Sequence, residues 1–446
     1  MFENLTKKPV HQSGKQKNLN NNQYKLKIST TILPLLLLVM TTLPLETFSQ
    51  QRFPAPEFES GYELPEATTP EPRALTLEYG DVIVLLGFLI ITSWLVIKKR
   101  SRQWILWLSV GALLYFGFWR EGCICSVGSV QNMVLSLSDP AYMVSYTVIA
   151  FFMLPLIFSL SFGRVFCASA CPLGVIQDLV IVRPVKVPVW IQKSLGLFPF
   201  VYLALAVLYA ATGTDFIICR YDPFIGIFRM GAEFHLIVLG ISFLLTGMFV
   251  ARPYCRFVCP YGALLKVTSM FSKRHLSITP NQCIQCKLCA DSCPFGAIDK
   301  PTPDKLVQDI KGRTGKFLLY AAIIPLLMLI GGFALSSSHV FLAKAHPDVY
   351  LAHLLIDNPE VMDDRDNLDV QTFLGSDRSV DELVESAGEI QASFYTGAWF
   401  TGVFIGLVAG LFLISQYIVR RRTDYEPNRG DCYSCGRCMK YCPVQK

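Results

Sequence analysis

The sequence predicts an all-α polytopic membrane protein, and three observations support this fold class. Of the 446 residues, 52% are hydrophobic, which is high for a soluble domain. Only 17% are charged, and these residues lie between long apolar runs rather than within them. The net charge of +6 comes from basic residues beside those runs, as expected for cytoplasmic loops, so it does not indicate nucleic-acid binding.

The first part of the chain is expected to precede the membrane core. Residues 1–30 are polar and rich in Lys, Asn and Gln, which is typical of disorder. Residues 31–49 contain an apolar segment that is either a signal peptide or an uncleaved anchor helix. Both alternatives would export residues 50–79, which are rich in Pro, Glu and Thr and are expected to form a periplasmic linker.

Seven apolar runs predict about seven core transmembrane helices. They lie at 81–97, 104–119, 142–161, 195–212, 234–250, 317–335 and 396–419, the first five of them in a membrane domain of residues 80–271. Basic residues follow every odd-numbered run, for example residues 98–100 and 420–422. One orientation in a bacterial inner membrane therefore satisfies the set, with the C-terminus in the cytoplasm. The acidic segment 336–395 then becomes a small periplasmic subdomain.

Two cysteine runs have the spacing of bacterial ferredoxins, in which the fourth cysteine of each run serves the other cluster. They are Cys283-x2-Cys286-x2-Cys289-x3-Cys293-Pro and Cys432-x2-Cys435-x2-Cys438-x3-Cys442-Pro. We therefore expect two [4Fe–4S] clusters with crossed ligation: one held by Cys283, Cys286, Cys289 and Cys442, the other by Cys432, Cys435, Cys438 and Cys293. Zinc binding is the alternative, but zinc sites usually use two separated pairs of ligands.

The two runs define a split, ferredoxin-like domain. Its halves, residues 272–316 and 420–446, are separated by the predicted helices 317–335 and 396–419 and by the outer segment. Both halves nevertheless fall on the cytoplasmic side of the predicted topology.

A second pair of motifs repeats the pattern Cys-x3-Cys-Pro-x-Gly. Cys167 and Cys171 belong to the first copy, and Cys255 and Cys259 belong to the second. Cysteines four residues apart lie on one face of a helix. The four thiols could converge on one further metal centre or cluster, or form a redox-active dithiol pair. Buried thiols acting as small apolar residues are the simpler alternative.

The remaining cysteines, Cys123, Cys125 and Cys219, fall on the periplasmic side of this topology. Asp222 stands before a proline where the repeated motif has its second cysteine. One hypothesis is a periplasm-side metal site that includes Asp222. A disulfide between two of the cysteines is the alternative in an oxidising compartment.

The paired Cys-x3-Cys-Pro motifs resemble those of the NosR/NapH-type membrane polyferredoxin family. The segments Arg422-Thr-Asp-Tyr425-Glu-Pro and His346-Pro-Asp-Val-Tyr-Leu-Ala352 resemble the NosR branch most. The resemblance implies that electrons cross the membrane to support a periplasmic metalloenzyme. NosR-like proteins usually carry a periplasmic FMN-binding domain, which residues 50–79 are too short to form. FMN would therefore come only through a flavoprotein partner, or flavin is not used.

These observations predict an iron–sulfur electron-transfer subunit without catalytic residues of its own. Its partners would be the lipid bilayer, a cytoplasmic or quinol donor and a periplasmic acceptor. An assembly or regulatory factor for a periplasmic metalloenzyme, such as nitrous-oxide reductase, is the alternative. Metal transport ranks lowest because no intramembrane carboxylate relay is present. The chain has no Cys-x-x-Cys-His haem motif and no Walker loop.

Overall fold

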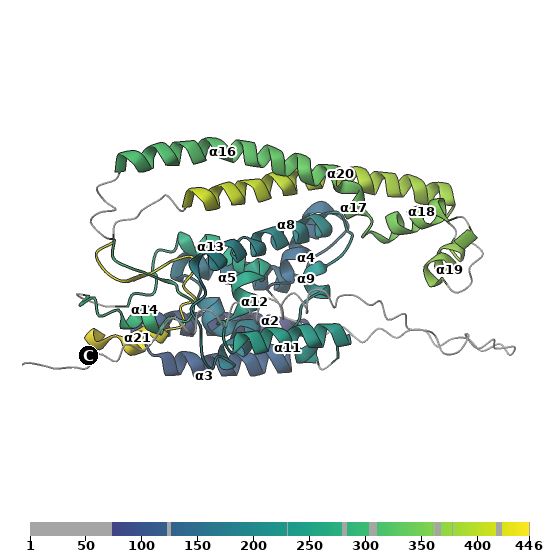
Figure 1. The fold of residues 1–446 in the computed structure, drawn as a ribbon. Coiled ribbons are helices and arrows are strands. Elements are labelled where there is room, and N and C mark those ends of the chain that lie inside the picture. Colours follow the sequence, from purple (N-terminus) through teal and green to yellow (C-terminus); the bar gives the residue numbers. More distant parts are fainter. Residues whose placement is uncertain are drawn as a thin grey trace, which may run out of the picture. The chain divides into compact units, whose positions relative to one another are not determined.

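Helices form most of the described chain in this computed structural model (Figure 1). The description covers residues 74–122, 126–229, 231–278, 283–302, 310–358, 360–361, 367–376, 378–415 and 422–445. The predicted disordered N-terminus, the signal or anchor segment and most of the predicted linker lie outside these residues, as do Cys123 and Cys125.

All seven predicted apolar runs form helices. In chain order they are α2 (Leu75–Trp94) continued by η1 (Leu95–Lys99), α3 (Arg102–Ala112) continued by η2 (Leu113–Trp119), α5 (Tyr146–Phe162), α8 (Phe198–Ala211), α11 (Phe234–Gly247), α16 (Ile310–Ser337) and α20 (Val380–Ser415). Four helical stretches of the described chain are long and apolar enough to cross a membrane: Leu75–Lys99, Val189–Ala211, Leu319–Ser337 and Val380–Ser415. The helices α5 and α11 are apolar but shorter.

Two helices begin earlier than the apolar runs predict. Helix α2 begins at Leu75, inside the stretch 50–79 that we expected to be a linker. Helix α20 begins at Val380 and takes in the end of the outer segment 336–395. Ser379 and Glu382 explain this start, because the Glu382 amide donates to Ser379 Oγ at 3.2 Å and the Ser379 amide donates to Glu382 Oε2 at 3.0 Å. This capping box starts the helix in a polar segment that hydropathy alone assigns to a loop.

Short helices connect and cover the long ones. They are α4 (Ser129–Ser138), η3 (Phe166–Ala170), α6 (Pro172–Leu179), α7 (Val189–Leu195), α9 (Ile217–Arg220), α10 (Ile225–Arg229), α12 (Pro253–Phe257) and α13 (Pro260–Met270). The main hydrophobic core lies among α2, α5, α8, α13 and these connectors, and all four Cys-x3-Cys-Pro cysteines belong to it.

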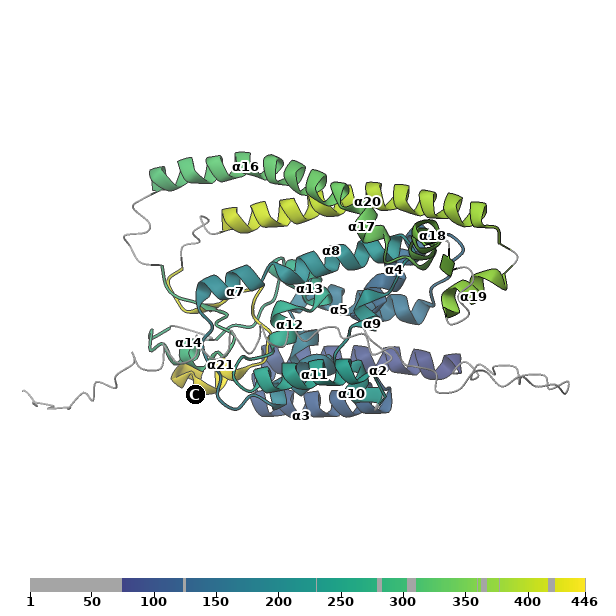
Figure 2. The same cartoon turned by 45° about the vertical axis from the view of Figure 1, so that its right-hand side comes forward.

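Helices α16 and α20 lie side by side in both ribbon views (Figures 1 and 2). Glycines allow this close approach. A Cβ on Gly402 would overlap the carbonyl oxygen of Gly331, and a Cβ on Gly406 would overlap that of Leu327. Small residues at such positions are typical of helix pairs that pack within a membrane.

Beyond α16, the helices α17 (His339–Ala343), α18 (Pro347–Asp357) and α19 (Leu368–Leu374) form a small separate core with the first part of α20. This core includes Val349, Leu355, Phe373 and Leu383. The outer segment of the sequence therefore folds as a helical subdomain.

The two ferredoxin halves meet at the other end of α16 and α20 (Figure 1). Strand β1 (Ile298–Asp299) pairs antiparallel with β2 (Glu426–Pro427), with Ile298 opposite Pro427. Helix α14 (Leu288–Ser292) packs against α21 (Arg437–Tyr441), which is followed by η5 (Pro443–Gln445). Segments more than a hundred residues apart in sequence thus build one small domain.

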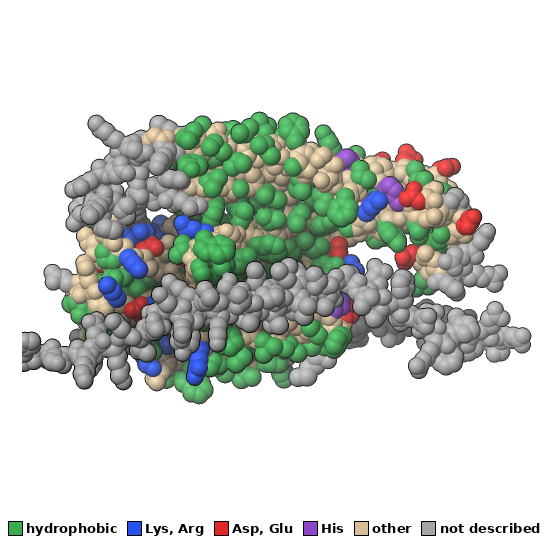
Figure 3. Space-filling model, in the orientation of Figure 1, with side chains coloured by type: hydrophobic (Ala, Val, Ile, Leu, Met, Phe, Trp, Pro, Cys, Tyr) green, Lys and Arg blue, Asp and Glu red, His purple; other side chains and the backbone are tan. Residues whose placement is uncertain are grey.

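Charge differs between the two ends. On the face shown in Figure 3, hydrophobic side chains cover the middle, most Lys and Arg side chains gather near α14 and α21, and most Asp and Glu side chains gather near α18 and α19. A wide apolar band between a basic end and an acidic end is the distribution expected of a membrane-embedded helical protein.

Candidate functional site

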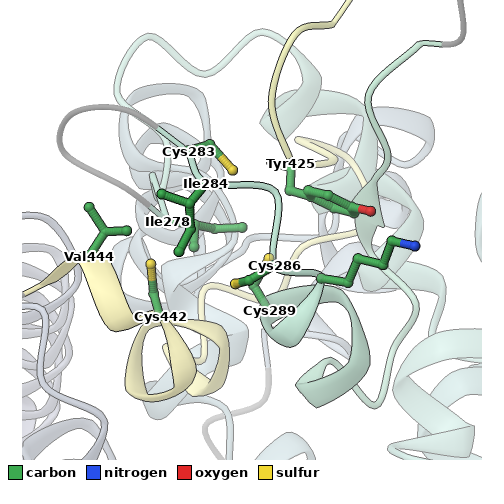
Figure 4. Close-up of a pocket in the computed structure, with 9 residues that line it drawn as sticks. Ile278, Cys283, Ile284, Cys286, Cys289, Tyr425, Cys442 and Val444 are labelled. Atoms are coloured by element: carbon green, nitrogen blue, oxygen red, sulfur yellow. The ribbon is translucent and has the colours of Figure 1, made fainter. Parts of the chain in front are cut away.

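The first cavity of the ferredoxin-like domain is lined by four thiols from both halves. Cys283 and Cys286 come from the loop that leads into α14, Cys289 lies on α14, and Cys442 comes from the end of α21 (Figure 4). Ile278, Ile284, Tyr425 and Val444 give this cavity an apolar wall, and Lys287 lies at its edge. These are the four cysteines that the sequence assigned to one cluster.

The second cavity is lined by the complementary set. Cys432, Cys435 and Cys438 lie on the loop and helix α21 of the second half, and Cys293 comes from the first half. Cys435 and Cys438 are buried, whereas Cys286 at the first cavity is exposed. The thiols of the second cavity are therefore the more deeply buried set.

The two cysteine loops share an unusual backbone conformation. Gln285 and Ser434 precede the second cysteine of their runs, and both have φ of 52°. Lys287 and Gly436 follow that cysteine, with φ of 65° and 72°. Only glycine adopts such angles at little cost, so Lys287 holds a strained conformation that the loop requires. The two halves are thus copies of one loop.

These two cavities fit iron–sulfur clusters. Four cysteines line each of them around a common space. Burial, together with the neighbouring thiols of Cys435 and Cys293, raises the pKa of Cys432 to about 12. Thiolates at this depth therefore need a cationic partner, and iron in a thiolate-ligated cluster provides one.

The four membrane thiols lie where the two Cys-x3-Cys-Pro copies meet. Cys167, Cys171, Cys255 and Cys259 are all buried. Gln177 Nε2 donates to Cys255 Sγ at 3.3 Å, which links α6 of the first copy to α12 of the second. A Cβ on Gly174 would lie 3.7 Å from Cys255 Sγ. The structure thus brings the two copies into direct contact.

Each copy also contributes a buried arginine that the sequence analysis missed. Arg164 and Arg252 both stand three residues before the first cysteine of their copy and are 4% and 0% exposed. The glycine of each copy faces the arginine of the other. A Cβ on Gly174 would lie 3.4 Å from Arg252 Nη1, and one on Gly262 would lie 3.3 Å from Arg164 Nη2. The complete repeated motif is therefore Arg-x-x-Cys-x3-Cys-Pro-x-Gly. The arginine occurs at the same position in both copies, and this repetition in the sequence could have identified it as a site residue.

Tyr433 joins the second cavity to the membrane thiols. It follows Cys432 and is 4% exposed, and its hydroxyl donates to the carbonyl oxygen of Cys255 at 3.2 Å. The guanidinium carbon of Arg164 lies 4.2 Å from the centre of its ring. One aromatic side chain therefore lines the second cavity and contacts the backbone of a membrane cysteine.

Asp178 anchors the same junction through three arginines. It accepts from Arg102 Nη2 at 2.5 Å and Arg437 Nη2 at 3.1 Å, and lies 3.6 Å from Arg252 Nε. Burial alone would raise the pKa of the Asp178 carboxyl, but these guanidinium groups hold it well below its usual range. Arg102 also donates to the Cys435 carbonyl oxygen at 2.9 Å. This network fixes the second cysteine loop on the helices beneath it.

Of the four predicted periplasm-side residues, the structure describes Asp222 and Cys219. Asp222 is buried, and its Oδ1 accepts from the Phe224 amide at 2.9 Å, a contact that stabilises the turn before α10. Asp222 and Cys171 line the same third cavity, together with Ser126. Cys219 lies on α9 and is exposed.

Comparison with known proteins agrees with this geometry. A family model described as a 4Fe-4S binding domain matches residues 144–197 and 234–279, which contain both Cys-x3-Cys-Pro copies. A second model of the same description matches residues 276–299, the first ferredoxin half. No solved structure matches the chain.

Three relatives illustrate the similarity. The uncharacterised protein MJ0750 of Methanocaldococcus jannaschii is 30% identical over 193 residues, which are 41% of this chain and 77% of that protein. The putative electron transport protein YccM of Escherichia coli is 29% identical over 170 residues, 34% of this chain and 46% of YccM. The regulatory protein NosR of Pseudomonas aeruginosa is 27% identical over 244 residues, 49% of this chain and 33% of NosR.

The helical fold, the thiol cavities and these relatives define an iron–sulfur electron-transport protein of the membrane. The chain belongs to the NosR/NapH-type family of membrane ferredoxin-like proteins. Its matched region spans less than half the length of YccM and of NosR.

Proposed function

We propose that the protein carries two [4Fe–4S] clusters and passes electrons between a cytoplasmic or quinol donor and a periplasmic acceptor. The observation that carries this proposal is the sorting of eight cysteines into two cavities, each lined by three thiols of one motif and the fourth of the other. Zinc sites or unrelated buried thiols give no reason for that exchange.

The surrounding residues are suited to hold such clusters. A thiolate-ligated cubane supplies reversible one-electron chemistry, with a potential set by burial, charge and hydrogen bonds. Leu276, Phe295 and Tyr433 keep water from the second cavity. The first cavity includes the exposed thiol of Cys286 beside Lys287, so a donor would approach the clusters from this side.

For the topology, we propose that the basic end faces the cytoplasm and that about seven helices cross an inner membrane. The basic residues 98–100, Arg183 and Lys186 support this orientation, and the acidic helices α18 and α19 would then face the periplasm. The acceptor would be a periplasmic metalloenzyme or a smaller carrier, and FMN would enter only through a partner.

The membrane thiols would form a further redox or metal centre between the second cavity and the periplasmic side. Their contact with Tyr433 and the position of Cys171 at the third cavity support this placement. The alternative is an assembly or regulatory factor for a periplasmic metalloenzyme, and the similarity to NosR, a regulatory protein, favours it.

Anaerobic purification followed by iron and sulfide analysis and EPR tests the proposal. We expect about eight iron atoms in the two cavities and two EPR signals of cubane clusters. An iron-free protein would refute the proposal. A Cys167→Ser/Cys255→Ser double variant should then block reduction of a periplasmic acceptor while leaving assembly of the partner intact. Loss of partner assembly with intact electron flow would favour the alternative.

A further inference from the structure

Arg164 contacts a membrane thiol and the loop that leads to the second cavity. Its Nη1 donates to the Gly430 carbonyl oxygen at 3.3 Å, in the loop that leads to Cys432. Its Nη2 lies 3.9 Å from Cys167 Sγ, and its guanidinium carbon lies 4.2 Å from the ring centre of Tyr433. The residue is 4% exposed, so these contacts replace water.

The charge of Arg164 is not balanced by a carboxylate salt bridge among the described residues. Asp431 acts on it electrostatically but is paired with Lys266 Nζ at 2.9 Å. Arg164 Nε has no hydrogen-bond partner in the described chain. A buried cation is costly unless negative charge lies nearby. Besides Asp431, the groups around it that can supply this charge are thiolates, at Cys167 on one side and at Cys432 on the other.

We propose that Arg164 is a positioning residue shared by the second cavity and the membrane thiols, so that the state of the thiols alters the potential of the cluster at Cys432. This inference rests on the proposed function, because it needs a cluster in the second cavity. The glycine exchange between the two copies supports it, since Gly262 leaves the space in which the Arg164 guanidinium reaches both sides. A role in packing alone would not require a cation at this point.

The test is a double-substitution cycle read out as midpoint potentials in EPR-monitored redox titrations of the full-length protein with its clusters. Arg164→Gln removes a positive charge and should lower the midpoint potential of the cluster in the second cavity. The midpoint potential of the cluster in the first cavity, which Cys442 lines, should not change. Cys167→Ser should shift the midpoint potential of the cluster in the second cavity. Because Arg164 and Cys167 contact each other, the shift in the double variant should differ from the sum of the two single shifts.

Arg256→Gln is the matched control. Arg256 donates to the Phe295 carbonyl oxygen at 2.8 Å beside the second cavity, and Cys293 acts on its charge. Among the described residues, it makes no hydrogen bond to Cys167. Arg256→Gln should lower the same midpoint potential, and in the double variant its shift and the Cys167→Ser shift should add. Additive shifts for Arg164 as well would overturn the inference while leaving the two clusters, and thus the proposed function, intact.

If the Arg164→Gln variant does not assemble its clusters, Arg164→Lys replaces it in the experiment. Lysine keeps the charge but cannot reach Gly430 and Cys167 together through one planar fork. The Cys167→Ser shift should therefore be smaller in the Lys background than in the parent protein. An identical shift in both backgrounds would rule out a shared position for Arg164.

Discussion

The hydroxyl of Tyr433 donates a hydrogen bond to the carbonyl oxygen of Cys255 across 3.2 Å. Tyr433 belongs to the second ferredoxin half, and Cys255 belongs to the second membrane copy, 178 residues earlier in the chain. Because both residues are buried, this bond fixes the cluster domain directly on the helices rather than through a linker.

Tyr433→Phe should therefore lower the free energy of unfolding modestly. It removes one buried hydrogen bond, which contributes roughly 1 kcal/mol, and keeps the ring beneath Arg164. Tyr433→Leu also removes the cation–π contact and should cost about 1–2 kcal/mol more. Thermal denaturation of the purified variants in detergent measures both. Equal losses for Phe and Leu would show that the ring–guanidinium contact contributes nothing.

Crossed ligation predicts opposite outcomes for two pairs of substitutions. Cys283→Ala/Cys442→Ala removes two ligands from the first cavity only, so about half of the iron and sulfide should remain, with one EPR signal. Cys283→Ala/Cys293→Ala removes one ligand from each cavity and should lower the content of both clusters. Iron and sulfide analysis beside EPR separates the two results.

The same two variants serve as controls for each other, because each lacks two thiols and both carry Cys283→Ala. If each motif held its own cluster, the results would exchange: the Cys283/Cys293 variant would keep one cluster and the Cys283/Cys442 variant would damage both. That exchange would refute the arrangement of the cavities.

Local patterns were enough to predict the helices and the grouping of the ferredoxin cysteines in space. All seven apolar runs are helical, because hydropathy over some twenty residues is a local property. The two cavities contain the thiols expected from the Cys-Pro spacing, because the fourth cysteine of such a run must turn away from its own loop.

The junction between domain and membrane could not be predicted, because its contacts join distant segments. Asp178 is an ordinary acidic residue in the sequence, and only the fold brings Arg102, Arg252 and Arg437 to it. The start of α20 was placed too late for a different reason. The capping box of Ser379 and Glu382 is a local signal, but hydropathy does not register it.

Acid should destabilise the protein through His275. Burial, reinforced by Arg429, lowers the pKa of this side chain to about 4, and neither ring nitrogen has a hydrogen-bond partner in the described chain. Between the ordinary His pKa of 6.5 and about 4, the unfolded chain binds a proton that the folded protein does not. Stability is therefore full above pH 6.5 and falls as the pH drops, by at most about 2 kcal/mol at pH 5.

His275→Phe keeps a ring of similar shape and removes the titration. Melting temperatures at pH 7.5 and pH 5 should fall less between the two conditions for this variant than for the parent protein. An equal fall would mean that other groups carry the acid sensitivity. Cluster content must be measured in each sample, because cluster loss would also lower stability.

The α16–α20 pair depends on glycine at the contact itself. A Cβ on Gly406 would overlap the Leu327 carbonyl oxygen, which belongs to rigid helix backbone. Gly406→Ala must therefore push the helices apart and should cost about 1–3 kcal/mol. Gly388 is the matched control in the same helix, because its Cβ would meet nothing within 4 Å. Gly388→Ala should leave stability unchanged or raise it by up to about 1 kcal/mol, since alanine is the better helix former. If thermal denaturation gave the same midpoint for both variants, the close packing of α16 on α20 would be refuted.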